Sequence, residues 1–394
     1  MLAALFGDTS ATAAERFDPR QPRSNHGDLQ RLPEVLRQPL LQQVERLAEA
    51  YRGPLSFGRG LRSPRTFDIG ADASGLLSLG LTVFFQDLSS TLLGVPGFLR
   101  QLEHELGVPP GSARLSAFAS AEDDGVSCHY DAEEVISIQL LGGKRFFTAP
   151  MTQIENPHGA QYGPHMPALE DLYPQAIDGF PDAEGLQWDI TDMRPGSVLF
   201  LPRGTWHRTE ATQPSLSVSI VVRPPVLLDA LWNWLHPWLL GDARWREPLY
   251  GNPPANELEP LFQQLAQRLR QAAPEMLAWQ DGRVSALQRW LVVPTSRLAL
   301  DQGSADGRVR VHVQALDQHW RHRATLDTEV PAHLAAALEW LVSRGRAFTL
   351  HALRDAAGGA PEADLIQLLD LLCKAHFLRR VPLQAVGVPH RPQA

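Results

Sequence analysis

The central part of the chain, residues 113–223, is a series of short hydrophobic segments separated by turn residues. The segments richest in β-forming residues are 135–141, 144–148, 197–201 and 216–222. Gly142-Gly143, Pro195-Gly196 and Pro214 mark the turns between them. Closely spaced strands with such turns predict an antiparallel sandwich or barrel. An insert at about residues 151–193, rich in Pro and Gly, interrupts the series and is too irregular to form core.

Helical patterns precede and follow this β-rich part. Residues 1–60 are polar, apart from an amphipathic helix predicted at 39–51; a strand at 81–85 and a helix at 96–106 come next. After residue 225 the spacing of Leu and Trp predicts helices at 226–239, 256–273 and 283–291. The last hundred residues predict a strand at 309–313, helices at 332–344, 349–356 and 362–375, and an extended segment at 377–382. The fold class is therefore α+β.

Charge and cysteine content exclude several classes of protein. The 394 residues contain 36 Lys and Arg against 44 Asp and Glu, so no overall positive field attracts nucleic acid or anionic lipid. The two cysteines, Cys128 and Cys373, are too few and too far apart for a disulfide scaffold or a cysteine zinc site. No segment has the roughly 20 apolar residues of a membrane span, and the N-terminus lacks a signal peptide. The expected location is the cytoplasm.

The strongest candidate for chemistry is His129-Tyr130-Asp131 combined with His207. Residues i and i+2 of a strand point to the same face, so His129 and Asp131 can direct two ligand atoms at one point. A histidine from another strand completes two imidazoles and one carboxylate on one side of a metal. Such a facial triad leaves coordination positions open and selects Fe(II) oxygenase chemistry.

The sequence around these residues strengthens the prediction. A β-hairpin with a Gly142-Gly143 turn follows directly, and Lys144 on its returning strand could pair with a carboxylate. Residues 195–207 form the pattern turn, apolar strand, turn and histidine, which places His207 at the rim of a barrel. By contrast, His26-Gly27-Asp28 has the same spacing but no strand after it, and we do not expect it to bind metal.

The run HYDAEEVISIQLLGGKRF, residues 129–146, resembles the first metal-binding block of the JmjC/cupin-like 2-oxoglutarate oxygenases. Residues 195–207 resemble the second block of this family, and the order of the parts is similar to that of its bacterial ribosomal-oxygenase branch. The resemblance implies a double-stranded β-helix (jelly-roll or cupin, JmjC-type), a helical dimerisation segment and a C-terminal winged-helix-like domain. Residues 1–60 show little of the usual N-terminal segment.

Carried over by motif position, the resemblance gives His129, Asp131 and His207 as the iron ligands and catalytic centre. Lys144 would hold the far carboxylate of 2-oxoglutarate, at a position where the ribosomal branch can carry Arg. Ser215 and Ser217 occupy positions at which relatives place small polar groups near the cosubstrate. The implied enzyme is a 2-oxoglutarate-dependent dioxygenase that uses Fe(II) and molecular oxygen to hydroxylate a substrate.

The domain division that follows has three parts. Residues 1–225 form the JmjC/cupin-like catalytic domain with its β-helix core at about 113–223, residues 226–293 the helical dimerisation segment, and residues 294–394 the winged-helix-like domain. The Leu and Trp stripe at 227–239 indicates packing against a twin subunit rather than lipid, so a homodimer is expected. DNA binding is not expected, because residues 364–372 offer aliphatic and acidic side chains where a recognition helix needs basic or amide ones.

Three hypotheses for function stay open on the sequence. The first is hydroxylation of a protein or peptide side chain, and the resemblance points to an Arg or His of a ribosomal protein. The second keeps the enzyme class, with a dedicated precursor peptide or a small metabolite as substrate. The third is a cupin-fold binding or regulatory protein without catalysis, whose winged helix contacts DNA or protein.

Overall fold

The structure is a computed structural model. It describes residues 1–7, 17–51, 53–58, 65–67, 72–89, 91–109, 111–164, 166–248, 255–270, 289–301, 307–316 and 322–381. Within these ranges no helix has the length and apolar character that crossing a membrane requires.

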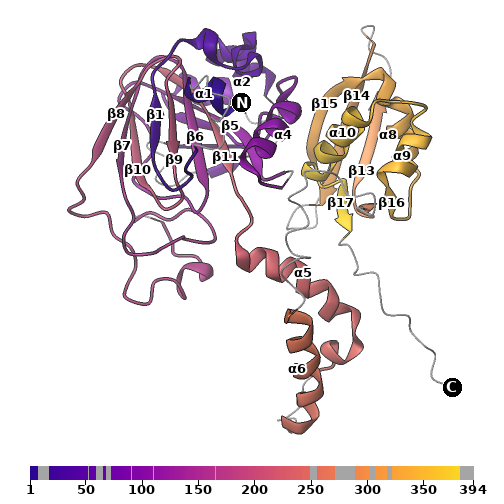
Figure 1. Cartoon of the computed structure of the whole chain (residues 1–394). Helices are drawn as coiled ribbons and strands as arrows, with labels where there is room; N and C mark the ends of the chain where they lie inside the picture. Colours follow the sequence, from indigo (N-terminus) through magenta and orange to yellow (C-terminus); the bar gives the residue numbers. More distant parts are fainter. Residues whose placement is uncertain are drawn as a thin grey trace, which may run out of the picture.

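Two antiparallel sheets face each other in the first 222 residues and confirm the predicted antiparallel β architecture (Figure 1). The larger has the order β1-β9-β6-β11-β5-β4-β2-β3 and the smaller the order β10-β7-β8. The strands of the larger sheet are β1 (Arg23–Asn25), β2 (Leu55–Gly58), β3 (Arg65–Phe67), β4 (Thr82–Phe85), β5 (Ala113–Ser120), β6 (Glu134–Leu141), β9 (Val198–Leu201) and β11 (Ser215–Val222). Those of the smaller are β7 (Lys144–Ala149), β8 (Asp189–Met193) and β10 (Trp206–Ala211).

Strand β11 shows how the sequence builds this arrangement. Its eight residues, SLSVSIVV, are all buried. The even-numbered ones, Leu216, Val218, Ile220 and Val222, belong to the main hydrophobic core. Alternation along a strand sends Ser217, Ser219 and Val221 to the opposite face, where they line a cavity between the two sheets. One face of the large sheet therefore makes the core, and the other makes the site.

The N-terminal residues cover the outer face of the large sheet. They form α1 (Leu2–Phe6), α2 (Val44–Ala50), α3 (Ala73–Ser78) and α4 (Val95–Leu106), with short 3₁₀ turns η1 (Leu29–Arg31), η2 (Glu34–Arg37) and η3 (Pro39–Leu41). The helix predicted at 39–51 is interrupted, because Gln43 has an extended backbone (φ −147°, ψ 124°) that separates η3 from α2. The predicted strand at 81–85 and helix at 96–106 are confirmed as β4 and α4.

The insert is irregular over most of its length, as predicted, with one 3₁₀ turn, η4 (Glu170–Leu172). Its last five residues differ from the prediction, since they form β8 and pair with β7. Met193 is the one buried residue of these five, and Ile190 is 59% exposed, which fits a strand at the edge of its sheet.

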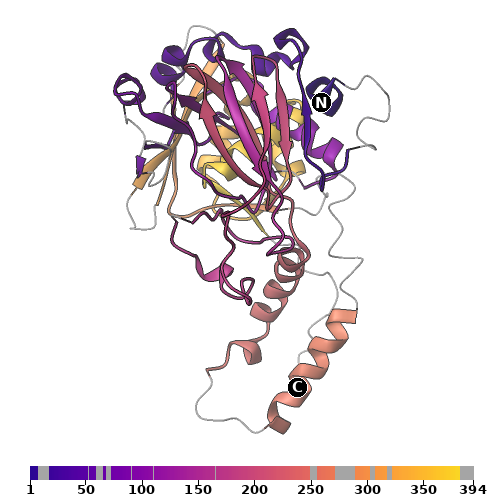
Figure 2. The ribbon, with the colours of Figure 1, turned by 90° about the vertical axis from the view of Figure 1, so that its left-hand side faces the viewer.

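An arm of two helices follows the barrel and projects away from it (Figures 1 and 2). It consists of α5 (Leu227–Gly241), η5 (Ala243–Arg246) and α6 (Ala255–Arg270), so the first two predicted helices are confirmed. The third prediction, a helix at 283–291, is wrong for the residues that the structure describes, because 289–291 belong to strand β12 (Arg289–Val292). Residues 283–288 lie outside the described residues. The β-branched and aromatic residues of this segment suit a strand better than a helix.

The C-terminal part contains three helices and two small sheets. The helices are α8 (Ala335–Val342), preceded by η7 (Ala332–Leu334), α9 (Leu350–Ala356) and α10 (Glu362–Lys374). The sheets are β16-β12-β17 and β13-β14-β15, made from β12, β13 (Arg297–Asp301), β14 (Arg308–Leu316), β15 (His322–Pro331), β16 (Phe348–Thr349) and β17 (Leu378–Val381). The predicted strand, three helices and final extended segment are all present. Because β12 pairs with β16 and β17, this part begins at residue 289 or before.

Helix α10 joins the C-terminal part to the barrel by packing against α4. Arg100 of α4 forms an ion pair with Asp370 (Nη1 to Oδ2, 2.9 Å), and Lys374 donates to the carbonyl of Ala113 (3.3 Å). The other face of α10, with Leu365, Leu368, Leu369 and Leu372, is buried in the C-terminal core. Helix α10 thus has partners on both faces.

Candidate active site

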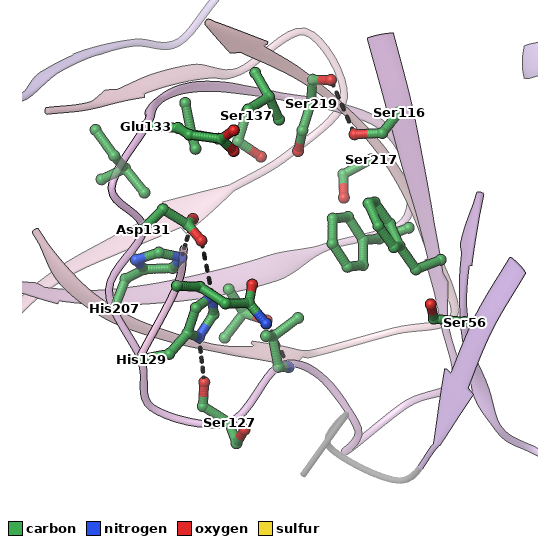
Figure 3. A pocket seen from close by; sticks show the side chains of 18 of the residues that line it. Ser56, Ser116, Ser127, His129, Asp131, Glu133, Ser137, His207, Ser217 and Ser219 are labelled. Atoms are coloured by element: carbon green, nitrogen blue, oxygen red, sulfur yellow. Dashed lines mark hydrogen bonds and ion pairs between the residues drawn. The ribbon is translucent and has the colours of Figure 1, made fainter. Parts of the chain in front are cut away.

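His129, Asp131 and His207 come together at one point between the sheets (Figure 3). The bridge between His129 and His207 holds their backbones side by side, and their rings are 4.2 Å apart. Oδ1 of Asp131 lies 3.9 Å from Nε2 of His129, and Oδ2 lies 3.6 Å from Nε2 of His207. The ligand atoms of all three residues lie within 4.8 Å of one another. The predicted triad is therefore assembled.

Backbone carbonyls fix the orientation of both imidazoles. Nδ1 of His129 donates to the carbonyl of Ser127 (2.7 Å), and Nδ1 of His207 donates to that of Thr205 (2.9 Å). A carbonyl can only accept, so each Nδ1 carries a proton, and each Nε2 faces Asp131. This is the arrangement by which proteins orient histidine ligands for a metal ion.

The electrostatic environment favours the unprotonated form of His207. Burial, and next the neighbouring His129, lower the pKa of His207 below its usual value, so this imidazole is neutral near pH 7. Two imidazole nitrogens and one carboxylate oxygen on one side form the donor set that suits Fe(II) with open positions on the other.

A cavity of about 390 Å³ opens in front of the triad, within the size range of small-molecule sites. Lys144 lines it and is 2% exposed, whereas the neighbouring Arg145 points outward and pairs with Asp192 (2.9 Å). Strand alternation thus sends the lysine, not the arginine, inward. Its ammonium donates to Oγ of Ser217 (2.9 Å) and lies 5.6 Å from the ring centroid of Phe118. Burial lowers the pKa of Lys144 to about 8.

The predicted serines occupy different places on β11. Ser217 lines the cavity and accepts from Lys144, while Ser215 does not line it and lies two residues before Ser217 on the same face. Within the described part of the chain, the buried Oγ of Ser215 has no hydrogen-bond partner. The same is true of Oγ of Ser120, which faces Ser215 across the sheet, and of Oε1 of Gln139. Unused polar atoms therefore gather on β5, β6 and β11 of the large sheet, which faces the sheet that carries Lys144.

The sequence reasoning missed a belt of three serines across the middle of the cavity. Ser219 of β11 lies opposite Ser116 of β5 on one side and Ser137 of β6 on the other. All three line the cavity, and Figure 3 shows their side chains above the triad in that view. The period-two pattern of Ser215, Ser217 and Ser219 could have revealed Ser219, but not its neighbours on β5 and β6.

A charged group at the cavity wall was also missed. Glu133, two residues after Asp131, lies 3.4 Å from Arg114 and 4.0 Å from Arg223. All three side chains line the cavity, and burial raises the pKa of the Glu133 carboxyl. The i, i+2, i+4 spacing of residues 129, 131 and 133 would have predicted that Glu133 shares a face with the ligands.

This chain is similar to a known protein family and to known proteins. Residues 110–229, which contain the triad and Lys144, match the family model described as JmjC domain. The uncharacterised protein YxbC of Bacillus subtilis (strain 168) is 25% identical over 293 residues, which span 68% of this chain and 87% of that protein. An X-ray structure of Escherichia coli YcfD is 15% identical with a TM-score of 0.45, covering 93% of this chain and 96% of the other. A structure of YcfD described as a ribosomal oxygenase from Escherichia coli, in complex with cobalt and 2-oxoglutarate, is 14% identical with a TM-score of 0.44 and the same coverage.

Residues 110–229 of this protein therefore match the JmjC domain, as the two sequence blocks predict, and their antiparallel strands have a cupin-like arrangement.

Proposed function

We propose that this protein is an Fe(II)- and 2-oxoglutarate-dependent oxygenase that hydroxylates a side chain of a protein or peptide. One observation carries the proposal: His129, Asp131 and His207 converge at the wall of a cavity that also holds a buried lysine. Bound iron would supply the activation of molecular oxygen and the attack on a C–H bond.

The residues around the triad fit 2-oxoglutarate. The Lys144 ammonium is buried, and in the described residues no carboxylate lies within ion-pair distance of it. An unpaired buried charge is costly, and the far carboxylate of a dicarboxylic acid would neutralise it. Ser217 would share the binding of this carboxylate, and the unpartnered hydroxyl of Ser215 is available nearby. Lys144 and Ser217 therefore act as the anchor for the cosubstrate, and His129, Asp131 and His207 hold the metal.

The barrel holds the reacting groups in place and excludes water from them. His129 and His207 are each 7% exposed, and Lys144 is less so, which keeps water from the reacting groups. The serine belt of Ser116, Ser137 and Ser219 offers hydroxyls that orient a polar substrate group in front of the metal.

The test is turnover of the cosubstrate, followed by a search for the product. Protein supplied with Fe(II) and 2-oxoglutarate should release succinate, and the Asp131→Ala variant should not. Incubation with ribosomal proteins from the source organism should then add the mass of one oxygen atom to an Arg or His side chain. If succinate forms but no ribosomal protein gains mass, the substrate is a precursor peptide or a metabolite; if no succinate forms, the protein is a binding module.

We also propose that the arm of α5 and α6 forms a homodimer. Several large apolar side chains of the arm are more than half exposed: Leu227, Leu228, Trp232, Leu240 and Phe262. A stripe of this kind is covered in most proteins by another helix, and a second copy of the arm offers the same stripe. Light scattering on the full chain should give twice the monomer mass, and Trp232→Glu should return it to the monomer.

The C-terminal part is proposed to be a winged-helix-like domain that does not bind DNA. The order α8, β16, α9, α10, β17 and the small sheet β16-β12-β17 support the first point. The packing of α10 against α4 supports the second, because this helix would otherwise be free to enter the major groove. Its role is then structural, holding the start of β5 through Lys374. The cytoplasm remains the proposed location.

A further inference from the structure

The insert (residues 151–193) carries the whole excess of negative charge in this protein. It contains eight Asp and Glu and no Lys or Arg, and the remaining 36 acidic residues balance the 36 Lys and Arg outside it. All eight are exposed: Glu155, Glu170, Asp171, Asp178, Asp182, Glu184, Asp189 and Asp192. Among the residues that the structure describes, only Asp192 has an ion-pair partner, Arg145.

The same segment exposes large apolar side chains. Ile177 is 86% exposed, Tyr173 60%, Leu169 52% and Phe180 46%. The rings of Tyr173 and Phe180 are in edge contact at 5.3 Å, and Leu169 and Ile177 lie within a few residues of Tyr173 in the same segment. Exposed apolar patches with a polar rim are typical of protein interaction sites.

The insert also forms part of the cavity in front of the triad. Gly159, Ala160, Gln161 and Met166 line that cavity. Arg223 donates to the carbonyl of Gly159 (3.1 Å), and Nε2 of His158 contacts Asp229 of α5 (3.2 Å). Both ribbon views show the insert at the end of the barrel from which α5 leaves (Figures 1 and 2). A partner on the insert therefore lies next to the entrance of the site.

We propose that the insert is the docking surface for a basic polypeptide whose Lys and Arg residues alternate with apolar ones. This inference rests on the proposed hydroxylation of a protein and names the chemistry of that protein. The acidic residues attract and orient the cationic side chains, while Tyr173, Ile177 and Phe180 cover the apolar ones. Nucleic acid and anionic membranes carry the wrong charge for this surface.

Fluorescence anisotropy with two synthetic peptides tests the inference on the full chain. One peptide is rich in Lys, Arg and Leu, and in the other Glu replaces every Lys and Arg. The basic peptide should bind at low salt and the acidic one should not. The triple variant Glu170→Gln, Asp178→Asn, Glu184→Gln should bind the basic peptide about tenfold more weakly, and high salt should remove this difference.

A control with the same change in net charge separates local docking from overall attraction. The triple variant Glu34→Gln, Glu45→Gln, Glu122→Gln changes exposed acids outside the insert and should keep the affinity within about twofold of the wild type. Equal losses in both triple variants, or equal binding of both peptides, would overturn the inference. Succinate formed from 2-oxoglutarate without peptide tests the enzyme itself: its absence refutes the oxygenase, whereas its presence with no loss in the insert variant refutes only the docking surface.

Discussion

The interior of the barrel and the insert beside its entrance are opposite in almost every physical property. The interior is buried and carries its reactive groups, Lys144, His207 and Ser217, on strands that are paired in the two sheets. The insert is exposed and almost without regular structure, and its charge is entirely acidic. Chemistry requires groups held in place in a dry site, whereas recognition of another macromolecule requires accessible surface. Changes in the barrel should therefore affect turnover with any substrate, and changes in the insert should affect only binding of a large one.

The sharpest test of this division is removal of the carboxylate ligand. Asp131→Ala leaves two imidazoles that cannot hold iron firmly, so succinate formation should fall on the order of a thousandfold, with or without protein substrate. Metal content measured after dialysis should fall in parallel. Asp355→Ala, at an exposed carboxylate of α9, is the matched control and should keep both values. Full metal binding by Asp131→Ala would mean that the site lies elsewhere.

The second largest effect is expected at the cosubstrate anchor. Lys144→Met keeps the length of the side chain but loses the charge, and a charge-assisted bond contributes about 2 kcal/mol. The KM for 2-oxoglutarate should therefore rise about thirtyfold. Thermal stability should not fall, because the substitution replaces a buried ammonium by an apolar group. An unchanged KM together with a lower Tm would make Lys144 a structural residue instead.

Much of the barrel and its triad could be predicted because the sequence encodes them locally. The alternation along 215–222 gives the faces of β11, and the spacing of His129 and Asp131 puts both on one face. The belt of Ser116, Ser137 and Ser219 could not be predicted, because it depends on the register between three strands, which a single sequence does not specify. For the same reason the pairing of β12 with β16 and β17 was missed: its partners lie about sixty and ninety residues further along the chain.

The protonation of Lys144 should have an effect of intermediate size on the KM for 2-oxoglutarate. Its pKa of about 8 lies below the usual lysine value because of burial, so the cationic form that binds a carboxylate predominates only below pH 8. The KM for 2-oxoglutarate should be constant below that pH and rise by up to about tenfold for each unit above it. Lys144→Arg, which keeps its charge throughout this range, should abolish the rise. The same rise in the arginine variant would assign the titration to another group.

The smallest effect is expected on the insert, and it distinguishes the two regions most directly. Ile177→Ser removes an apolar side chain that is 86% exposed, so the fold loses nothing that it buries, and only a docked partner would cover this residue. The KM for a basic peptide substrate should rise about threefold, as for an apolar contact at the edge of an interface, while turnover of 2-oxoglutarate without peptide stays constant. Leu79→Ser, at a residue 68% exposed beyond α3, is the matched control and should change neither value. If both variants behave alike, the apolar patch contributes nothing to recognition, and the acidic residues alone distinguish the insert from the rest of the surface.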